Sequence, residues 1–435
     1  MNLDVLPPTD LGALRTLFAG VTAVLTLGNL PWFARTIDIK RSGLDAVSTP
    51  LDDDMENIDL DELPREKSLL IRWLPILSIP TTMVVGVMFA TVLLIATFDI
   101  LPRTMLLAAI PLYLLFYSQA IDSSKVVRKT SLLPWTCLLL AIAPEDPGGQ
   151  ALSIVAIKIL LVNMWFTAGL RKAWNGGWAW WNGSTLRHHL AIEALENRTR
   201  PESSGSLRLA MMPHVCTVLA IFTMVAELGS PLVILPGVAW ACLLAYLVFL
   251  GLHLGIFLLW RLDYLTFCFL PIGFVLLVPS DFTAIETHLT TELDWRTVAT
   301  IAVSLFFITN CFLGFENWPI HDWPMFSYHV PWGHVRVRRL FARHAGRRMP
   351  VVLNDRYINR GIARHGRYLL WYGEQWTREK DIDPTTIEEL ELIETTIDEH
   401  GHLEDETLMK FERLTQLRRW LWRPPWEEST RRDSS

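Results

Sequence analysis

Long apolar stretches separated by short polar loops make up most of the chain. Nine of them approach about 20 residues, the length that a helix needs to cross the hydrocarbon core of a bilayer. They cover about 14–34, 72–98, 101–121, 131–145, 152–171, 211–231, 236–260, 264–280 and 297–315. The third and fourth follow the pattern least well. Residues 1–316 are therefore expected to form an all-α polytopic membrane domain, a bundle of eight or nine transmembrane helices.

The remaining residues, 317–435, have a pattern typical of a small α+β domain outside the membrane. Residues 334–341 alternate between apolar and polar, Ala345-Gly346 is a turn sequence, and residues 349–353 suit a return strand. Beyond Pro384, apolar residues recur at helical spacing, which predicts two amphipathic helices joined near Gly401. Their apolar positions are Ile387, Leu390, Ile393 and Ile397, then Leu408, Phe411, Leu414, Leu417 and Leu421.

Composition supports a membrane protein and disfavours several other classes. Hydrophobic residues make up 51% of the chain and charged residues only 19%, against roughly 25% charged residues in a soluble domain. Basic and acidic residues nearly balance, 39 against 45, so no positive field points to nucleic acid. The five cysteines all lie in apolar stretches, which excludes a disulfide framework and a cysteine zinc site. They are Cys137, Cys216, Cys242, Cys268 and Cys311.

Lys and Arg gather in alternate loops, which sets the orientation under the positive-inside rule. The loops after the first, third and fifth stretches are basic, whereas residues 281–294 contain no Lys or Arg. With nine spans, the N-terminus lies outside and the C-terminal domain in the cytoplasm, and the expected location is a bacterial inner (plasma) membrane. The loop at about 37–65 contains an acidic stretch, residues 51–64, which is either a flexible linker or a docking site.

Polar residues inside apolar spans are expensive and therefore candidates for function or helix pairing. The candidates here are Lys158, Asn163, Glu227 and His253. The simplest interpretation pairs Lys158 with Glu227 as a buried ion pair, and the alternative is a transport site. Lys172, at the end of the same span as Lys158, lies on the same helix face about 21 Å away. The two lysines are expected to line one internal cavity from opposite ends.

Residues 166–190 carry the densest set of unusual residues. The span ends at Arg171-Lys172, a Gly-Gly pair breaks the helix, four Trp residues follow, and Ser184 or Thr185 can cap the next helix. Residues 172–197 are thus expected to form a re-entrant or interfacial segment with an aromatic belt. A lysine desolvated beside aromatic rings can also lose its proton near neutral pH, which makes Lys172 a candidate base.

This segment resembles the signature region of the horizontally transferred transmembrane domain, the family that includes the vitamin K-dependent γ-glutamyl carboxylase. In that family a span ends in a run like residues 168–172, and a Trp-containing stretch, a Gly-Ser or Gly-Thr pair and a helix follow. Further similar pieces occur in the family's order. They are residues 14–20, residues 226–231, the span with His253 and residues 317–327. The likeness covers residues 10–330.

The resemblance implies oxygen-dependent chemistry on a reduced quinone, menaquinone or vitamin K, in a dry cavity. In the carboxylase a lysine deprotonates the reduced vitamin, oxygen adds, and the resulting alkoxide removes a γ-proton from glutamate before carbon dioxide adds. Lys172 matches that lysine by position, and a protein or peptide would be the second substrate. The family's carboxylase has a histidine in the polar loop that enters the preceding span, but the corresponding residues here, 129–135, contain no histidine. Quinone or lipid chemistry other than peptide carboxylation therefore remains open. The carboxylase's C-terminal domain is luminal, opposite to the side that the loop charges predict.

Glu227 and His253 are expected to join Lys172 as catalytic residues that handle protons in one cavity. The expected substrate-binding residues are Trp178, Trp181, His188, His189 and Lys158. His188, His189 and Glu193 resemble one histidine box of a di-iron desaturase, but the other boxes that such a site needs are missing from the sequence. His321, His329 and His334 also lack the spacing of a metal site, so no metal is predicted. Besides membrane lipids, the expected partner is a quinone.

The alternative from another class is a non-catalytic membrane protein, either a lipid carrier or a scaffold for partner proteins. In that case the polar residues in the spans only hold helices together, at roughly 0.6–2 kcal/mol each. Convergence of Lys172, Glu227 and His253 would favour the enzyme, and dispersed positions would favour the carrier or scaffold.

Overall fold

The computed structural model describes residues 11–45, 73–120, 130–197, 201–235, 238–260, 264–291, 293–313, 332, 335–352, 373, 376–398 and 402–411. The chain divides into two compact units. The first, here the helical unit, comprises residues 1–41, 56–178 and 221–328. The second, here the sheet unit, comprises residues 42–55, 179–220 and 329–435.

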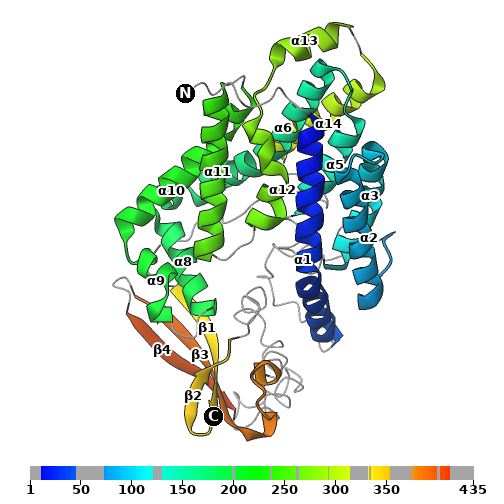
Figure 1. The fold of residues 1–435 in the computed structure, drawn as a ribbon. Coiled ribbons are helices and arrows are strands. Elements are labelled where there is room, and N and C mark those ends of the chain that lie inside the picture. Colours follow the sequence, from blue (N-terminus) through cyan, green and yellow to red (C-terminus); the bar gives the residue numbers. More distant parts are fainter. Residues whose placement is uncertain are drawn as a thin grey trace, which may run out of the picture. The chain divides into compact units, whose positions relative to one another are not determined.

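Five helices among the described residues are long and apolar enough to cross a membrane (Figure 1). They are Leu11–Ala34 within α1 (Leu11–Asp45), α2 (Ile79–Thr97), Pro147–Gly176 within α6 and the turn after it, Ala239–Leu259 within α11 (Ala239–Trp260), and α14 (Trp295–Leu313). A broken pair, Leu270–Leu277 and Phe282–Thr291, bends by 94° and is a candidate sixth span. The chain is therefore an integral membrane protein.

The expected count of eight or nine spans stays a prediction. The expected third, fourth and sixth spans correspond to shorter apolar helices, α3 (Pro102–Tyr117), α5 (Leu132–Ile142) and α10 (Pro213–Leu228). The expected eighth span is not one continuous helix. It is divided into η7 (Leu265–Phe269), α12 (Leu270–Ile272) and η8 (Gly273–Leu277) and is followed by α13 (Phe282–Thr291). Pro271 falls within this break, and proline removes a backbone donor.

The loop expected at about 37–65 begins later than the end of the first apolar stretch indicated. Helix α1 continues to Asp45, so residues 37–45 are helical rather than the start of the loop. Lys and Arg are good helix formers, so the helix extends past the last apolar residue. The rest of the acidic loop, residues 46–65, lies outside the described residues.

Helix α6 (Pro147–Arg171) is the centre of the helical unit. In the most apolar 18-residue segment of α6, 94% is buried inside the protein, against 22–39% in the corresponding segments of the other four spanning helices. A helix that is apolar on all sides is expected to be enclosed by others, and α5, α13 and α14 all pack against α6. The polar side chains in the middle of α6, Lys158 and Asn163, are therefore buried inside the helical unit.

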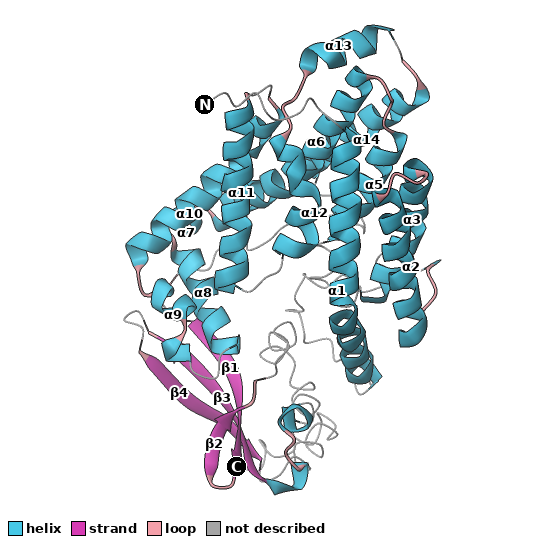
Figure 2. Ribbon diagram, viewed as in Figure 1, coloured by secondary structure: helices cyan, strands magenta, loops and turns pink. Residues whose placement is uncertain are grey.

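The sheet unit contains one antiparallel sheet with the strand order β2-β1-β3-β4 (Figure 2). Its strands are β1 (Val335–His344), β2 (Arg347–Pro350), β3 (Ile387–Ile397) and β4 (Leu403–Phe411). The hairpin predicted from residues 334–353 is confirmed: β1 pairs with β2, and Ala345 and Gly346 turn the chain with φ of 50° and 69°. Helix α8 (Ser184–Asn197) contacts β1 in this unit.

The prediction of amphipathic helices beyond Pro384 is wrong where the structure describes the chain, because β3 and β4 lie there. The register places Ile393 and Ile397 on the face of Val335 and Val337, whereas Leu390 lies on the opposite face. Both sets are buried, so β3 buries different faces at its two ends. A bulge also shifts the β1–β3 register at His344. Together these features give apolar spacings of three and four, which resemble a helix. Residues beyond 411 lie outside the described part.

Candidate functional site

Lys172 stands where the central helix changes its geometry. Helix α6 begins at a cap, where Asp146 Oδ1 accepts the Gly149 N–H at 2.9 Å, and continues to Arg171. Lys172 is the first residue of the π-helical turn η4 (Lys172–Gly176), which ends at Gly177 with φ of 50°. Single π-helical turns of this kind are frequent at functional sites. The Gly-Gly break expected from the sequence is confirmed.

Glu227, in the last turn of α10, is the partner of Lys172. Lys172 Nζ donates to Glu227 Oε2 at 2.6 Å and also contacts Oε1. Both residues are buried, with 2% and 3% of their surface exposed. A buried charge pair must offset the loss of hydration of both groups, which requires close contact of this kind. The expected ion pair of Glu227 with Lys158 is therefore wrong.

Gly169 allows this contact. A Cβ placed on Gly169 would lie 2.8 Å from Glu227 Cβ and 3.1 Å from the Leu228 nitrogen. Gly169 precedes Lys172 by three residues, so both share one face of the chain at this helix end. The end of α10 can therefore approach α6 closely at the level where Lys172 reaches the carboxylate.

Gly169→Ala is expected to destabilise the protein, because the added methyl group displaces Glu227. Overpacking of this kind typically costs about 1–3 kcal/mol, against a gain of about 1 kcal/mol in helix propensity. Gly255→Ala is the control, since nothing lies within 4 Å of a Cβ there. Thermal unfolding should give a lower Tm for Gly169→Ala and an equal or higher Tm for Gly255→Ala. A Gly169→Ala protein as stable as the wild type would show that the close approach is unimportant.

Lys158 has a different set of partners. Its Nζ donates to the Val278 carbonyl oxygen at 2.6 Å and to Ser280 Oγ at 3.0 Å, and the residue is 1% exposed. Both acceptors lie in the break between η8 and α13. Lys158 therefore satisfies exposed backbone at a broken helix, as buried polar residues commonly do in membrane proteins.

His253, on α11, belongs to an aromatic cluster. Its Nδ1 lies 2.8 Å from the Phe249 carbonyl oxygen and therefore donates to it. Its ring stacks on Phe269 at 4.9 Å between centroids and lies 5.9 Å from Trp165. Trp165 precedes Lys172 by seven residues, about two helical turns. The structure thus brings Lys172 and Glu227 together, and it places His253 beside Trp165, which precedes Lys172 by about two turns.

The four Trp residues after Lys172 differ in exposure. Trp174 is 82% and Trp178 is 76% exposed, as expected at a membrane interface. Trp181 is half-buried and Trp180 fully buried. The next helix, α8, begins at Ser184, whose N–H donates to Asn182 Oδ1 at 2.9 Å. The side chain of Asn182 therefore supplies a cap at this end, a role that the sequence pattern gave to Ser184 or Thr185.

His188 and His189, expected in substrate binding, lie on α8 in the sheet unit. Their rings are 6.0 Å apart, and the His189 ring is 6.5 Å from Trp180. Burial lowers the pKa of His188 to about 4. His188 is therefore neutral at physiological pH, and its buried Nδ1 has no hydrogen-bond partner in the described part of the chain. Neither contact involves the groups around Lys172.

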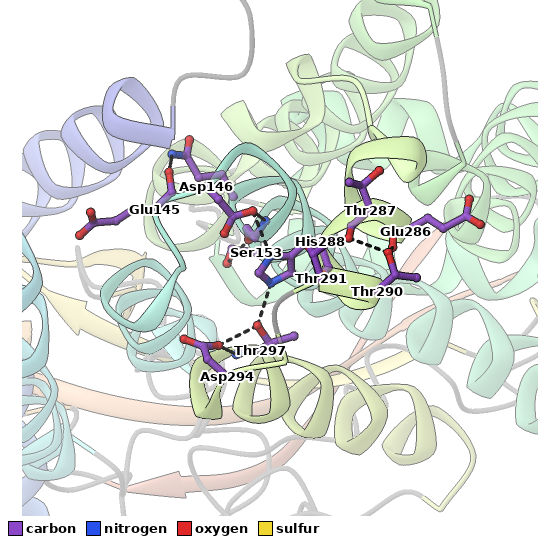
Figure 3. A network of polar contacts seen from close by, with 12 residues as sticks. Glu145, Asp146, Ser153, Glu286, Thr287, His288, Thr290, Thr291, Asp294 and Thr297 are labelled. Atoms are coloured by element: carbon purple, nitrogen blue, oxygen red, sulfur yellow. Dashed lines mark hydrogen bonds and ion pairs between the residues drawn. The ribbon is translucent and has the colours of Figure 1, made fainter.

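A second polar cluster, which the sequence pattern did not indicate, surrounds His288 (Figure 3). His288 on α13 lies with Nδ1 3.0 Å from Asp146 Oδ1 and with Nε2 2.7 Å from Thr297 Oγ1. The hydroxyl of Thr297 in turn lies 2.8 Å from Asp294 Oδ1. His288 and Thr297 are both buried. The cluster, here the His288 cluster, joins α13 to the first turns of α6 and α14.

Asp294 gives this cluster an acid-sensitive element. Hydrogen bonds from the backbone and the hydroxyl of Thr297 hold the pKa of Asp294 below its ordinary value of 3.8. A carboxylate whose pKa is lower in the folded state stabilises the fold at pH values above its unfolded-state pKa. This stabilisation is lost as the pH falls through the folded-state pKa. The Tm difference between wild type and Asp294→Ala should therefore shrink as pH falls from about 5 to about 3. A difference independent of pH would contradict this role of Asp294.

The described residues contain no group of three His, Cys, Asp or Glu side chains that could hold a metal ion. All five cysteines are buried and free. His321, His329 and His334 lie outside the described residues. Comparison with protein-family models, with curated proteins and with solved structures found no match for this chain. The geometry therefore defines an integral membrane protein with a buried lysine–carboxylate pair, and the likeness to the carboxylase family rests on sequence motifs.

Proposed function

We propose that the protein is a membrane-embedded enzyme, similar to the vitamin K-dependent carboxylases, that acts on a reduced quinone or another lipid-soluble substrate with Lys172 as base. The observation that carries this proposal is the buried contact of Lys172 with Glu227. A carboxylate in contact with an amine can hold the proton that the amine releases, so that the amine is free to take another. Such a pair inside a membrane is by default a candidate for function.

The residues near Lys172 are compatible with an aromatic ligand that carries oxygen atoms. Trp165 stacks on Phe249 with 3.6 Å between ring centroids. Its Nε1 is buried and has no hydrogen-bond acceptor among the described residues, although buried Trp N–H groups usually have one. A quinol or quinone oxygen is an acceptor of the kind that is missing. When bound, the quinol would supply the oxidisable ring and the hydroxyl proton.

Within this proposal each residue has a separate task. Lys172 Nζ accepts a hydroxyl proton from the substrate, and Glu227 holds a proton next to it. His253 donates Nδ1–H to a backbone carbonyl, so in the neutral ring Nε2 is left as an acceptor. Burial of all three keeps bulk water away from the reacting groups, where it would otherwise quench a strong base. Peptide carboxylation is not proposed, because the family's histidine is missing from residues 129–135.

We further propose a bundle of eight or nine spans in a bacterial inner membrane, with the N-terminus outside and the C-terminal domain in the cytoplasm. The loop charges support this orientation. One observation favours the alternative of a non-catalytic carrier or scaffold: His253 contacts Trp165, about two turns before Lys172, and not the Lys172–Glu227 pair.

The test is to incubate the purified protein with reduced menaquinone and oxygen and to look for quinone epoxide by mass spectrometry. Wild-type protein should produce epoxide, and Lys172→Ala should produce none above the protein-free control. Epoxide formed equally by both proteins would remove Lys172 from the mechanism. No epoxide from either, with no quinone co-purifying, would instead support the carrier or scaffold.

A further inference from the structure

The buried hydroxyl groups of Thr167 and Thr300, in the helical unit, lack the local hydrogen bond that others of their kind make. Ser and Thr in membrane helices usually donate to the carbonyl four residues earlier. Eleven described residues in helices of this unit do so: Thr22, Thr82, Thr91, Thr97, Thr136, Ser153, Thr287, Thr290, Thr291, Ser304 and Thr309. Thr167 and Thr300 are 0% exposed, and their Oγ1 atoms have no partner among the described residues. Each is therefore available to another hydrogen-bonding group.

Both hydroxyls belong to one polar seam between α6 and α14. Thr297, Thr300, Ser304 and Phe307 recur at spacings of three and four on α14 and are all buried. Asn163, on α6, donates to the Phe307 carbonyl oxygen at 2.9 Å. Its own Oδ1 is buried and has no partner in the described residues. Thr167 follows Asn163 by one turn of α6.

The two helices run in the same direction, so the seam has defined ends. The His288 cluster joins the first turns of α6 and α14, and Asn163 joins both helices farther along. Lys172 follows Thr167 by five residues, about 7.5 Å farther along the helix axis. Both ends therefore carry groups that titrate, whereas the groups between them are hydroxyls and one amide.

The spacing of these groups is suited to water. Side chains one turn apart on a helix lie about 5–6 Å from one another, which is too long for a direct hydrogen bond. One bridging water that makes two bonds of about 2.8 Å spans such a gap. Buried waters characteristically satisfy polar atoms that have no protein partner. Three such atoms occur along the seam: Thr300 Oγ1, Asn163 Oδ1 and Thr167 Oγ1.

We propose that the seam between α6 and α14 holds a file of buried waters that conducts protons between the His288 cluster and Lys172. Each transfer moves one proton from a donor to the next oxygen. After a proton has passed along the whole file, the net charge of the waters is unchanged. A cation path is disfavoured, because the middle of the seam contains no carboxylate. The proton role rests on the proposed function of Lys172, whereas the presence of the waters does not.

The waters can be detected by radiolytic hydroxyl-radical footprinting of the whole protein in detergent, read by mass spectrometry. Phe307 on the seam is 1% exposed, and Phe89 and Phe116 are equally buried controls outside it, at 0% and 2%. Phe307 should be oxidised several-fold faster than both controls. Thr300→Val should bring its rate down to theirs, whereas Thr309→Val, on the exposed side of α14, should not. Equal rates for the three phenylalanines in the wild type would overturn the proposal.

The proton role has its own readout. With reduced menaquinone as substrate, Thr300→Val should lower kcat several-fold and leave KM unchanged. An unchanged kcat in a protein that does oxidise quinol would overturn the proton role. If the wild type oxidises no quinol, the proposed function fails, and the footprinting result still decides whether the waters are present.

Discussion

Lys172→Met is expected to cost the protein about 3–5 kcal/mol of folding stability, because it leaves the Glu227 carboxylate buried without its partner. Glu227→Leu should have a similar cost, since it leaves the Lys172 ammonium unpaired. The double variant should be more stable than either single variant. Replacing both charges with apolar groups of similar size removes the buried charge altogether, which is often neutral or stabilising.

Lys158→Met is the matched control for this cycle. It removes a lysine from the same helix, but its acceptors, Val278 O and Ser280 Oγ, are neutral. The expected loss is therefore smaller, about 1–3 kcal/mol. Unfolding in mixed detergent can be followed by tryptophan fluorescence, because the chain has 19 Trp residues. Additive losses in the double variant would show that Lys172 and Glu227 do not interact in the folded protein.

Gly148→Ala is the second substitution with a large expected effect. A Cβ at this position would lie 2.3 Å from the Ala284 carbonyl oxygen and 2.5 Å from His288 Cβ. Because one of these atoms is backbone, α13 would have to move away from α6. The expected loss of stability is about 3 kcal/mol, at the upper end for overpacking.

The same substitution should also expose His288. Its contacts with Asp146 and Thr297 depend on α13 lying against α6, so Gly148→Ala should make His288 react faster with diethyl pyrocarbonate. Gly28→Ala is the control, because nothing lies within 4 Å of a Cβ there. Wild-type stability and unchanged His288 reactivity in Gly148→Ala would contradict the close packing of α6 on α13.

The sequence identified the polar residues of the site but not their pairing. Lys158, Lys172 and Glu227 stand out because charge inside an apolar span is rare. Both lysines lie on one face of α6, so periodicity alone allows Glu227 to meet either of them. The choice depends on how far α10 is shifted along α6, and Gly169 permits that approach at the level of Lys172. Such a shift is a tertiary property that no local pattern contains.

Local patterns succeeded where structure is local. The β1–β2 hairpin follows from alternation and a turn within 20 residues of chain. Strand β3 was misread as a helix because its buried residues change face along its length. His288 and Asp146 are 142 positions apart and lie in two different loops, both free of Lys and Arg. Neither residue stands out in its loop. Their contact follows from the packing of α13 on α6.

The most direct test of the account compares quinol oxidation by three purified variants with that of the wild type. Lys172→Met and Glu227→Gln change the buried pair, and Lys410→Met replaces a half-exposed lysine of the sheet unit. Each protein is first shown to be folded by its tryptophan fluorescence and by a single peak in gel filtration. If Lys172 is the base, Lys172→Met abolishes turnover, Glu227→Gln lowers kcat, and Lys410→Met matches the wild type. Folded Lys172→Met protein that turns over quinol at the wild-type rate would contradict the role of Lys172 as base.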